Sequence, residues 1–443
     1  MEIQLSDSFS YKRLIRFTLP SIIMMIFTSV YGVVDGFFVS NFAGKVPFAS
    51  VNLIMPFLMI LSDVGFIFGT GGSALVAKLM GEGRREEANR VFSLLIYVII
   101  GVGALFTVLA MAVMRPVSIL LGADAEMLEY CVTYGRIVMV STIPFMLQTA
   151  FQSFMVTAER PRMGLAVTVA AGATNIALDF LFVGYFKWGI VGAAWATVTA
   201  ESIGGFIPLL YFLLPNKSPL HIGRTVWNGP ALLQTCWNGS SEFVSNLSRS
   251  VVNMLYNLQL MKYAGSDGVA AYGVIMYANF IFISVFIGYA IGTAPIVSYN
   301  YGAENHVEMK SIFRKSVRMI GAMGVIMMVI GQLLCRPVAS IFVGYDAGVL
   351  DMTVRAFRIY AMMYLLTGFN INGSDFFTAL NNGKVSAIIS FLRTLVFQSA
   401  AVMLLPLFFG VRGIWCAVIV AEIMSFLVTC HYIVKLRPVY QYY

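Results

Sequence analysis

The stretch MGLAVTVAAGATNIALDFLFVGYF, residues 163–186, contains a single charged side chain, Asp179, among 24 residues. As a helix, a run of this length and polarity can cross a hydrocarbon core of roughly 30 Å. Comparable apolar runs recur between residues 17 and 434, so the sequence predicts about twelve membrane-spanning helices. A spanning β-barrel is disfavoured, because runs such as residues 91–114 lack the alternating polarity of barrel strands.

The composition of the whole chain excludes a water-soluble globule. Of its 443 residues, 59% are hydrophobic and only 11% are charged, against roughly 25% charged residues in an ordinary soluble domain. The net charge is +8, but most of the 29 basic residues fall in segments that a cytoplasmic amino terminus would place inside, such as those holding Arg84, Arg160 and Arg314. This bias predicts that both termini are cytoplasmic, and the positive charge requires no nucleic-acid partner.

An internal repeat divides the chain into two halves. Residues 81–92, GEGRREEANRVF, match residues 302–313, GAENHVEMKSIF, at an offset of 221, and the same offset relates GIVGAAWATVTAE (189–201) to GVRGIWCAVIVAE (410–422). We therefore expect an all-α integral membrane protein with two pseudo-symmetric six-helix lobes, 1–214 and 231–443, around a central cleft. The segment 215–230, rich in Pro, Gly and polar residues, is predicted to be a cytoplasmic linker.

Acidic side chains within the apolar runs are the first candidates for function. A carboxylate at mid-membrane costs roughly 2.5 to 3.5 kcal/mol on insertion scales, which makes it a functional-site hypothesis by default. Asn175 and Asp179 are four residues apart and share one helix face, and Asp35 lies in the first helix of the same lobe. Burial disfavours the charged form of a carboxyl group, so these acids could bind and release a proton or a small cation. The alternative is a structural hydrogen bond between helices one and five.

Other buried acids are secondary candidates. Glu201, four residues after Thr197, is repeated as Glu422, and a residue kept in both lobes favours a packing role over a functional one. Asp63 and Glu242 have no acidic counterpart in the repeat, so we consider them as residues that line the cleft.

Cysteine and histidine chemistry has little support in the sequence. The five cysteines and three histidines are scattered, with neither a disulfide framework nor a metal-ligand spacing. We expect no cofactor and no metal site, apart from a possible sodium ion at Asp35 and Asp179.

Three stretches resemble one transporter family. GTGGSALVAKLMGEG (69–83), NIALDF (175–180) and GTAPIVSYNYGAEN (292–305), together with the repeat, are similar to the MATE (multidrug and toxic compound extrusion) family, in particular its bacterial MepA-like and DinF-like branch. We expect a monomeric multi-pass protein of the bacterial inner or plasma membrane. The resemblance implies export of cationic or amphipathic drugs, driven by inward flow of H⁺ or Na⁺.

The resemblance also assigns site residues. The family's acid in helix one falls on Asp35, the Asn and Asp of helix five on Asn175 and Asp179, and the Thr of helix six on Thr197. Gln152 in helix four occupies about the place of a further amide.

The chain departs from the family at a second cation site. Some branches carry acids in helices seven and ten, where this chain has Ser248 or Arg249 and Asn370. This departure favours coupling through the amino-terminal lobe and leaves Glu242 and Asp375 as alternatives.

We therefore predict a secondary active multidrug exporter that works by cation-coupled antiport and alternating access, and not an enzyme. One alternative is a flippase for a lipid-linked headgroup or a metabolite, which should present several cations to phosphate. The arginines available for that are Arg136, Arg249, Arg355, Arg358 and Arg393. A membrane-embedded enzyme is disfavoured because no Ser or Cys is paired with a mid-span histidine. A passive channel is disfavoured because no ring of charges is evident.

Overall fold

A computed structural model describes residues 3–344 and 346–443 of the chain, and all regular structure in these residues is helical. The first half contains α1 (Tyr11–Phe38), η1 (Val39–Ala43), α2 (Lys45–Ser62), α3 (Val64–Phe66), η2 (Ile67–Gly71), α4 (Gly72–Gly81), α5 (Arg85–Leu120), α6 (Ala125–Met139), α7 (Thr142–Thr157), α8 (Pro161–Leu178), η3 (Asp179–Tyr185) and α9 (Gly189–Leu213). The second half contains α10 (Gly229–Gly302), α11 (His306–Val343), α12 (Ala347–Ala361), α13 (Tyr364–Ala379), α14 (Gly383–Phe391), η4 (Leu392–Phe397), α15 (Gln398–Phe409) and α16 (Val411–Tyr440). The segments named η are π-helical turns that continue their neighbouring helices.

The predicted number of membrane crossings is confirmed. Among the described residues, nine helical segments are long and apolar enough to cross a membrane, and the bent pair α6 and α7 makes a tenth. The helix α10 counts twice, because its backbone leaves the helical conformation at Gly265 (φ 65°, ψ −158°). The pair α12 and α13 occupies the place of α6 and α7 in the second half, and the repeat assigns it as the twelfth crossing.

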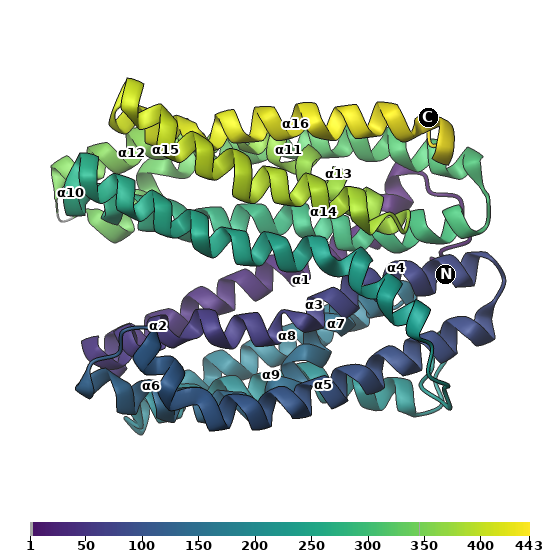
Figure 1. Cartoon of the computed structure of the whole chain (residues 1–443), viewed down its shortest axis with the longest axis horizontal. Helices are drawn as coiled ribbons and strands as arrows, with labels where there is room; N and C mark the ends of the chain where they lie inside the picture. Colours follow the sequence, from purple (N-terminus) through teal and green to yellow (C-terminus); the bar gives the residue numbers. More distant parts are fainter. Residues whose placement is uncertain (1–2, 345) are drawn as a thin grey trace.

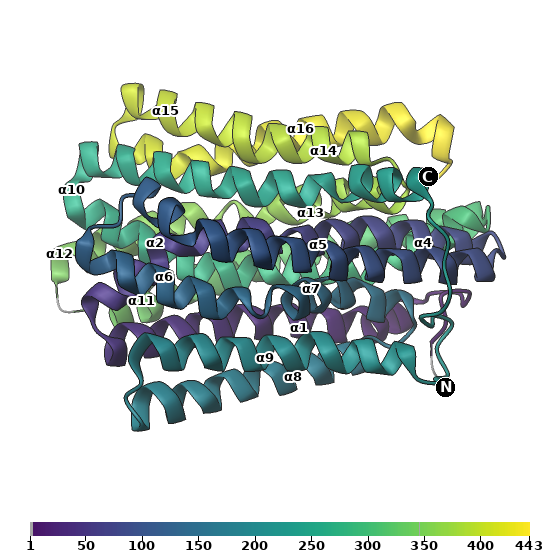
Figure 2. The same cartoon turned by 60° about the horizontal axis from the view of Figure 1, so that its bottom comes forward.

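The helices form two bundles that lie side by side (Figure 1). The first bundle consists of α1 to α9 and the second of α10 to α16, and the long helices of both run roughly along one common axis (Figures 1 and 2). Both chain ends lie at the same end of the molecule, as an even number of crossings requires. We call this the terminal end. Residues 214–228, which join the bundles, contain no helix.

The repeat is visible in how equivalent helices begin. The Asp124 side chain caps α6 by accepting hydrogen bonds from the backbone N–H groups of Glu126 and Met127. Its repeat mate Asp346 caps α12 in the same way. Such caps satisfy backbone donors that a helix start leaves without partners. Equivalent helices in the two halves therefore begin with the same aspartate cap, as expected for pseudo-symmetric lobes.

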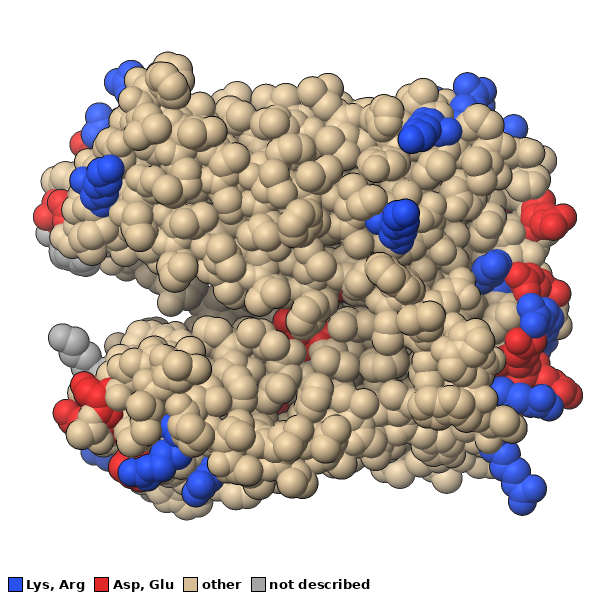
Figure 3. Space-filling view, viewed as in Figure 1, with Lys and Arg blue, Asp and Glu red and all other residues tan. Residues whose placement is uncertain are grey.

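The outer surface is suited to a bilayer. In Figure 3, Lys, Arg, Asp and Glu gather at the two ends, and a broad band with almost no charge lies between them. Large apolar side chains such as Val108, Leu258 and Leu407 are exposed on the surface. A contiguous apolar surface of this size is unusual for a soluble monomer, so the band marks the membrane-facing side of the helices.

The two bundles touch at the terminal end and separate at the other, where Figure 3 shows an opening with carboxylates at its inner end. The terminal-end contact, which we call the seam, joins α4 and α10 around two repeat-related glycines. A Cβ atom on Gly81 would fall on the Tyr299 carbonyl oxygen, and one on Gly302 would fall on that of Lys78. Only glycine allows these backbones to approach so closely, as at other membrane helix interfaces.

Candidate functional site

Helix α1 and the continuous helix formed by α8 and η3 bring three of the predicted coupling residues together. Asp35 lies near the end of α1, Asn175 lies near the end of α8, and Asp179 begins the π-helical turn η3. Asp179 is fully buried and Asn175 is 2% exposed, whereas Asp35 is partly exposed. A π turn shifts the register of the side chains that follow, and such turns occur often at functional sites. The local backbone thus changes at the residue that the sequence singled out.

The carboxyl groups of Asp35 and Asp179 lie within hydrogen-bonding reach of each other. No described residue donates a hydrogen bond to either carboxylate oxygen of Asp179, or to Oδ1 of Asp35. Two carboxylates in contact away from water repel each other strongly if both are charged. A proton shared between them, or a small cation held by both, removes this repulsion. The arrangement is therefore chemically suited to bind either.

Tyr134 of α6 also belongs to this group. Its hydroxyl lies within hydrogen-bonding reach of Thr197, and it interacts electrostatically with Asp35, Asp179 and Glu201. The structure thus brings Thr197 and Glu201 of α9 to the aspartate pair. Tyr134 was missed by sequence reasoning, because a tyrosine in an apolar helix carries no local signal of the partners that packing gives it.

Glu201 contacts a break between two helices. Its carboxylate accepts a hydrogen bond from Ser141, which lies between α6 and α7 where their axes bend by 59°. Nearby, the Tyr31 hydroxyl is within reach of the Gln148 amide. Gln148 was also missed, although an offset of 222, one residue more than 221, pairs Asp124 with Asp346 and places Gln148 opposite Asn370. The packing role expected for Glu201 stays a prediction.

Gln152 and Asn175 are less connected than the sequence suggested. Gln152 on α7 is buried, and its amide oxygen receives no hydrogen bond from the described residues. The amide oxygen of Asn175 likewise lacks a donor among them. No described hydrogen bond joins Gln152 to either aspartate, so its place in the site stays a prediction.

The oxygen atoms that the site offers as ligands favour a proton or a hard cation. Carboxylate and amide oxygens without hydrogen-bond donors are ligands that suit hard cations rather than soft ones. In the described parts of the chain, no ion pair involves Asp35, Asp179 or Glu201. Within the same residues, no three His, Cys, Asp or Glu side chains are grouped to hold a metal ion.

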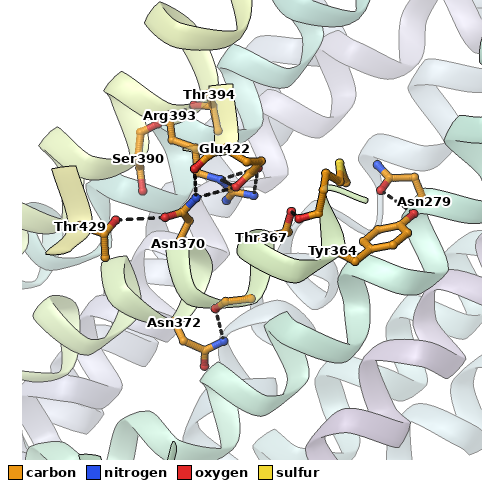
Figure 4. Close-up of polar contacts among 12 residues, drawn as sticks. Asn279, Tyr364, Thr367, Asn370, Asn372, Ser390, Arg393, Thr394, Glu422 and Thr429 are labelled. Atoms are coloured by element: carbon orange, nitrogen blue, oxygen red, sulfur yellow. Dashed lines mark hydrogen bonds and ion pairs between the residues drawn. The ribbon is translucent and has the colours of Figure 1, made fainter. Parts of the chain in front are cut away.

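The second bundle neutralises its corresponding glutamate (Figure 4). Arg393, in η4, donates to Glu422 through Nε and Nη2 at distances of 2.8 to 3.2 Å. Asn370 donates to Glu422 Oε2 at 2.6 Å and accepts from the Thr429 hydroxyl at 3.2 Å. The Glu422 side chain is 1% exposed and that of Arg393 is 13% exposed. A buried bidentate pair of this kind leaves little free charge for binding a cation.

A further group of polar residues connects the end of α2 in the first bundle with α10 and α13 in the second. Glu242 of α10 and Asp375 of α13 lie within hydrogen-bonding reach of each other. Asp63, at the end of α2 in the first bundle, is within reach of Asn246 on α10 in the second. Arg249 is exposed and interacts electrostatically with both Asp63 and Glu242. Asp63 thus makes a polar contact across the bundles, a link that no sequence pattern indicated.

Comparison with known proteins settles the family. A model of the MatE family matches residues 20–181 and 243–402, one stretch in each bundle. The chain belongs to the MatE family. Two matches to one model also support the internal repeat.

Several relatives of this MatE protein align over nearly its whole length. "Multidrug export protein MepA" of Staphylococcus saprophyticus is 23% identical, covering 93% of this chain and 91% of the relative. The protein of the same name from Staphylococcus haemolyticus is 22% identical, covering 95% and 93%. A solved outward-facing structure of a multidrug resistance MATE family transporter of the MOP superfamily is 21% identical over 98% of both chains, with a TM-score of 0.91. The apolar helices and bacterial relatives identify a multi-pass plasma-membrane protein.

Proposed function

We propose that this MatE protein exports amphipathic cationic compounds in exchange for H⁺ or Na⁺. Its relatives named multidrug export proteins suggest the cargo. The observation that supports coupling is the contact between the Asp35 and Asp179 carboxyl groups, with no ion-pairing cation among the described residues. Such a pair changes its internal repulsion when it gains or loses one positive charge.

Occupancy of this pair has a structural route to the second bundle. A shared proton or bound Na⁺ holds α1 against η3, whereas two bare carboxylates push them apart. The helix α1 also packs against α10, where Gly288 lies against the backbone of Ile22 and Gly292 against Thr18. A shift of α1 therefore changes the contact between bundles. A ligand moves such an equilibrium only through its different affinity for the two states, and the carboxylate pair supplies that difference.

The proposed orientation places both termini in the cytoplasm, because Lys and Arg are more abundant in the segments at that side. The seam then closes the cytoplasmic side, and the opening faces outward. In this state the protein releases substrate and takes up H⁺ or Na⁺. Separation of the seam and closure of the opening would give the inward-facing state.

The test is gradient-driven dye efflux in energised membrane vesicles that contain the wild type, Asp35→Asn or Asp179→Asn. Each amide variant removes the repulsion permanently, so we expect at least tenfold slower efflux at equal protein level. Asp267→Asn, at an exposed aspartate outside the site, is the control and should transport normally. Imposing a pH gradient or a Na⁺ gradient separately identifies the ion. Undiminished transport by Asp179→Asn would refute the assignment.

The flippase alternative has weaker support. It needs several free cations facing one phosphate group, but Arg393 is held by Glu422 and Arg249 lies between Asp63 and Glu242. Binding of a lipid pyrophosphate by the purified protein, together with failure to extrude any dye, would favour it over drug export.

A further inference from the structure

A cavity outside the opening lies on the second bundle. It is an open hollow with a volume of about 640 Å³, bordered by the start of α10, the turn between α13 and α14, and the end of α16. Its lining includes Trp237, Gln234, Asn382, Lys384 and Tyr440. All lining residues belong to the start of α10, the turn between α13 and α14 with the start of α14, or the end of α16, which are ends of helices in the second bundle. The cavity is therefore at the edge of the membrane, at the terminal end, away from the transport opening.

The inner wall of this cavity is polar and is fixed by hydrogen bonds. Asn238 donates to Asn381 Oδ1 at 2.8 Å and accepts from the Gly383 backbone N–H at 3.2 Å. Asn382 donates to the Tyr440 hydroxyl at 3.0 Å. These bonds fix the shape of the wall.

Lys384 is the one charged residue in the lining. It is exposed, and no described residue forms a hydrogen bond or an ion pair with it. It lies in the first turn of α14, where the positive end of the helix dipole adds a further partial charge. No acidic side chain opposes it in the cavity lining, so the site favours an anion.

The outer rim of the cavity is apolar. Trp237 is 57% exposed and Leu233 is 62% exposed, and both lie on the first turns of α10. Tryptophan is enriched where spanning helices pass from hydrocarbon to headgroups. A rim of this kind suits an acyl chain, and the lysine suits a phosphate. Both parts occur together in an anionic phospholipid, whereas a soluble phosphate would leave the apolar rim unused.

We propose that this cavity binds the headgroup of an anionic phospholipid from the membrane leaflet at the terminal end. The phosphate lies at Lys384, and the acyl chains run along Trp237 and Leu233. Cationic pockets between helices on the cytoplasmic side recognise acidic headgroups by the same chemistry. The Asn381 side chain also donates to the Ala74 carbonyl of α4 at 3.3 Å. A bound lipid therefore supports a wall that contacts the first bundle next to the seam.

The experiment measures lipid binding to the purified full-length protein in detergent, by native mass spectrometry and by thermal unfolding. Phosphatidylglycerol and phosphatidylcholine with identical acyl chains are compared for the wild type and for Lys384→Gln. We expect preferential retention of phosphatidylglycerol by the wild type and about fivefold weaker binding by Lys384→Gln, as expected for loss of one lysine contact. Lys384→Arg should restore it.

Lys435→Gln is the matched control, because Lys435 is also exposed near the terminal end but does not line the cavity. It should bind phosphatidylglycerol like the wild type. Equal weakening by Lys384→Gln and Lys435→Gln would reduce the effect to general surface charge and overturn the proposal. Equal binding of phosphatidylcholine, or the same thermal protection from inorganic phosphate alone, would also overturn it.

Discussion

At the scale of single residues, the two halves of the repeat treat an equivalent glutamate in different ways. Glu201 of the first bundle accepts from a neutral serine, whereas Glu422 of the second is held by an arginine and an asparagine. The second bundle is thereby close to neutral in its interior around Glu422. The first bundle keeps Asp35, Asp179 and Glu201 without a countercharge among the described residues. This asymmetry favours cation coupling through the first bundle.

The Arg393 and Glu422 pair predicts a stability effect that separates structure from transport. Arg393→Met leaves a buried carboxylate with only Asn370 as donor, and removing one partner of a buried pair costs about 3 to 5 kcal/mol. We expect a clearly lower midpoint in thermal unfolding of the purified protein. The double variant Arg393→Met with Glu422→Leu removes both charges and should recover most of the loss. A double variant less stable than Arg393→Met would contradict this account.

At the scale of elements, the amino-terminal segment before α1 fastens the two bundles together. Leu5 and Phe9 are fully buried. The Leu5 N–H donates to Glu159 in the first bundle at 2.7 Å, and the Phe9 N–H donates to Glu308 in the second at 2.8 Å. This short segment, which we call the strap, thus links the two bundles at the terminal end. Local hydrophobicity does not reveal such a strap, because its partners are some 150 and 300 residues away in sequence.

Glu159 gives the strap a dependence on pH. The residue lies in the turn between α7 and α8, outside the spanning helices, and burial raises its pKa above the ordinary value for glutamate. A raised native pKa means that the folded state holds the proton longer than the unfolded state, so stability falls as pH rises through the native pKa. Glu159→Gln removes this loss. In thermal unfolding between about pH 4 and 7, its advantage over the wild type should grow with pH. Glu86→Gln, at an exposed residue, should show no such trend, and a constant difference for Glu159→Gln would contradict the assignment.

Long apolar runs predict the spanning helices well, because bilayer crossing imposes length and polarity directly on sequence. The internal repeat is likewise visible in the sequence, and the structure shows that α6 and α12 begin alike at Asp124 and Asp346. Contacts between distant helices were not predictable in this way. Tyr134 meets the acids only after α6 packs against α9, and the π turn at Asp179 leaves no signature in local composition. The sequence was enough to select Asp35 and Asp179 as candidates. Their neighbour Tyr134 becomes visible only in the packed structure.

At the scale of the whole molecule, distances between repeat-related positions can measure the movement of one bundle against the other. Glu86 and Val307 lie at the terminal-end starts of α5 and α11, and both are highly exposed. Leu120 and Ile341 lie near the opposite ends of the same two helices and are also highly exposed. Spin labels at each pair therefore report separately on the seam and on the opening.

The seam predicts which way these distances move. Gly81→Leu places a side chain where α4 meets the Tyr299 backbone, so the terminal end cannot close. If the bundles rock as rigid bodies, the Glu86 to Val307 distance should lengthen and the Leu120 to Ile341 distance should shorten in pulsed electron paramagnetic resonance. Gly101→Leu is the control, since no atom lies within 4 Å of a Cβ atom placed on Gly101, and it should leave both distances unchanged. Lengthening at both ends would mean that the bundles separate rather than rock, which would exclude alternating access by this movement.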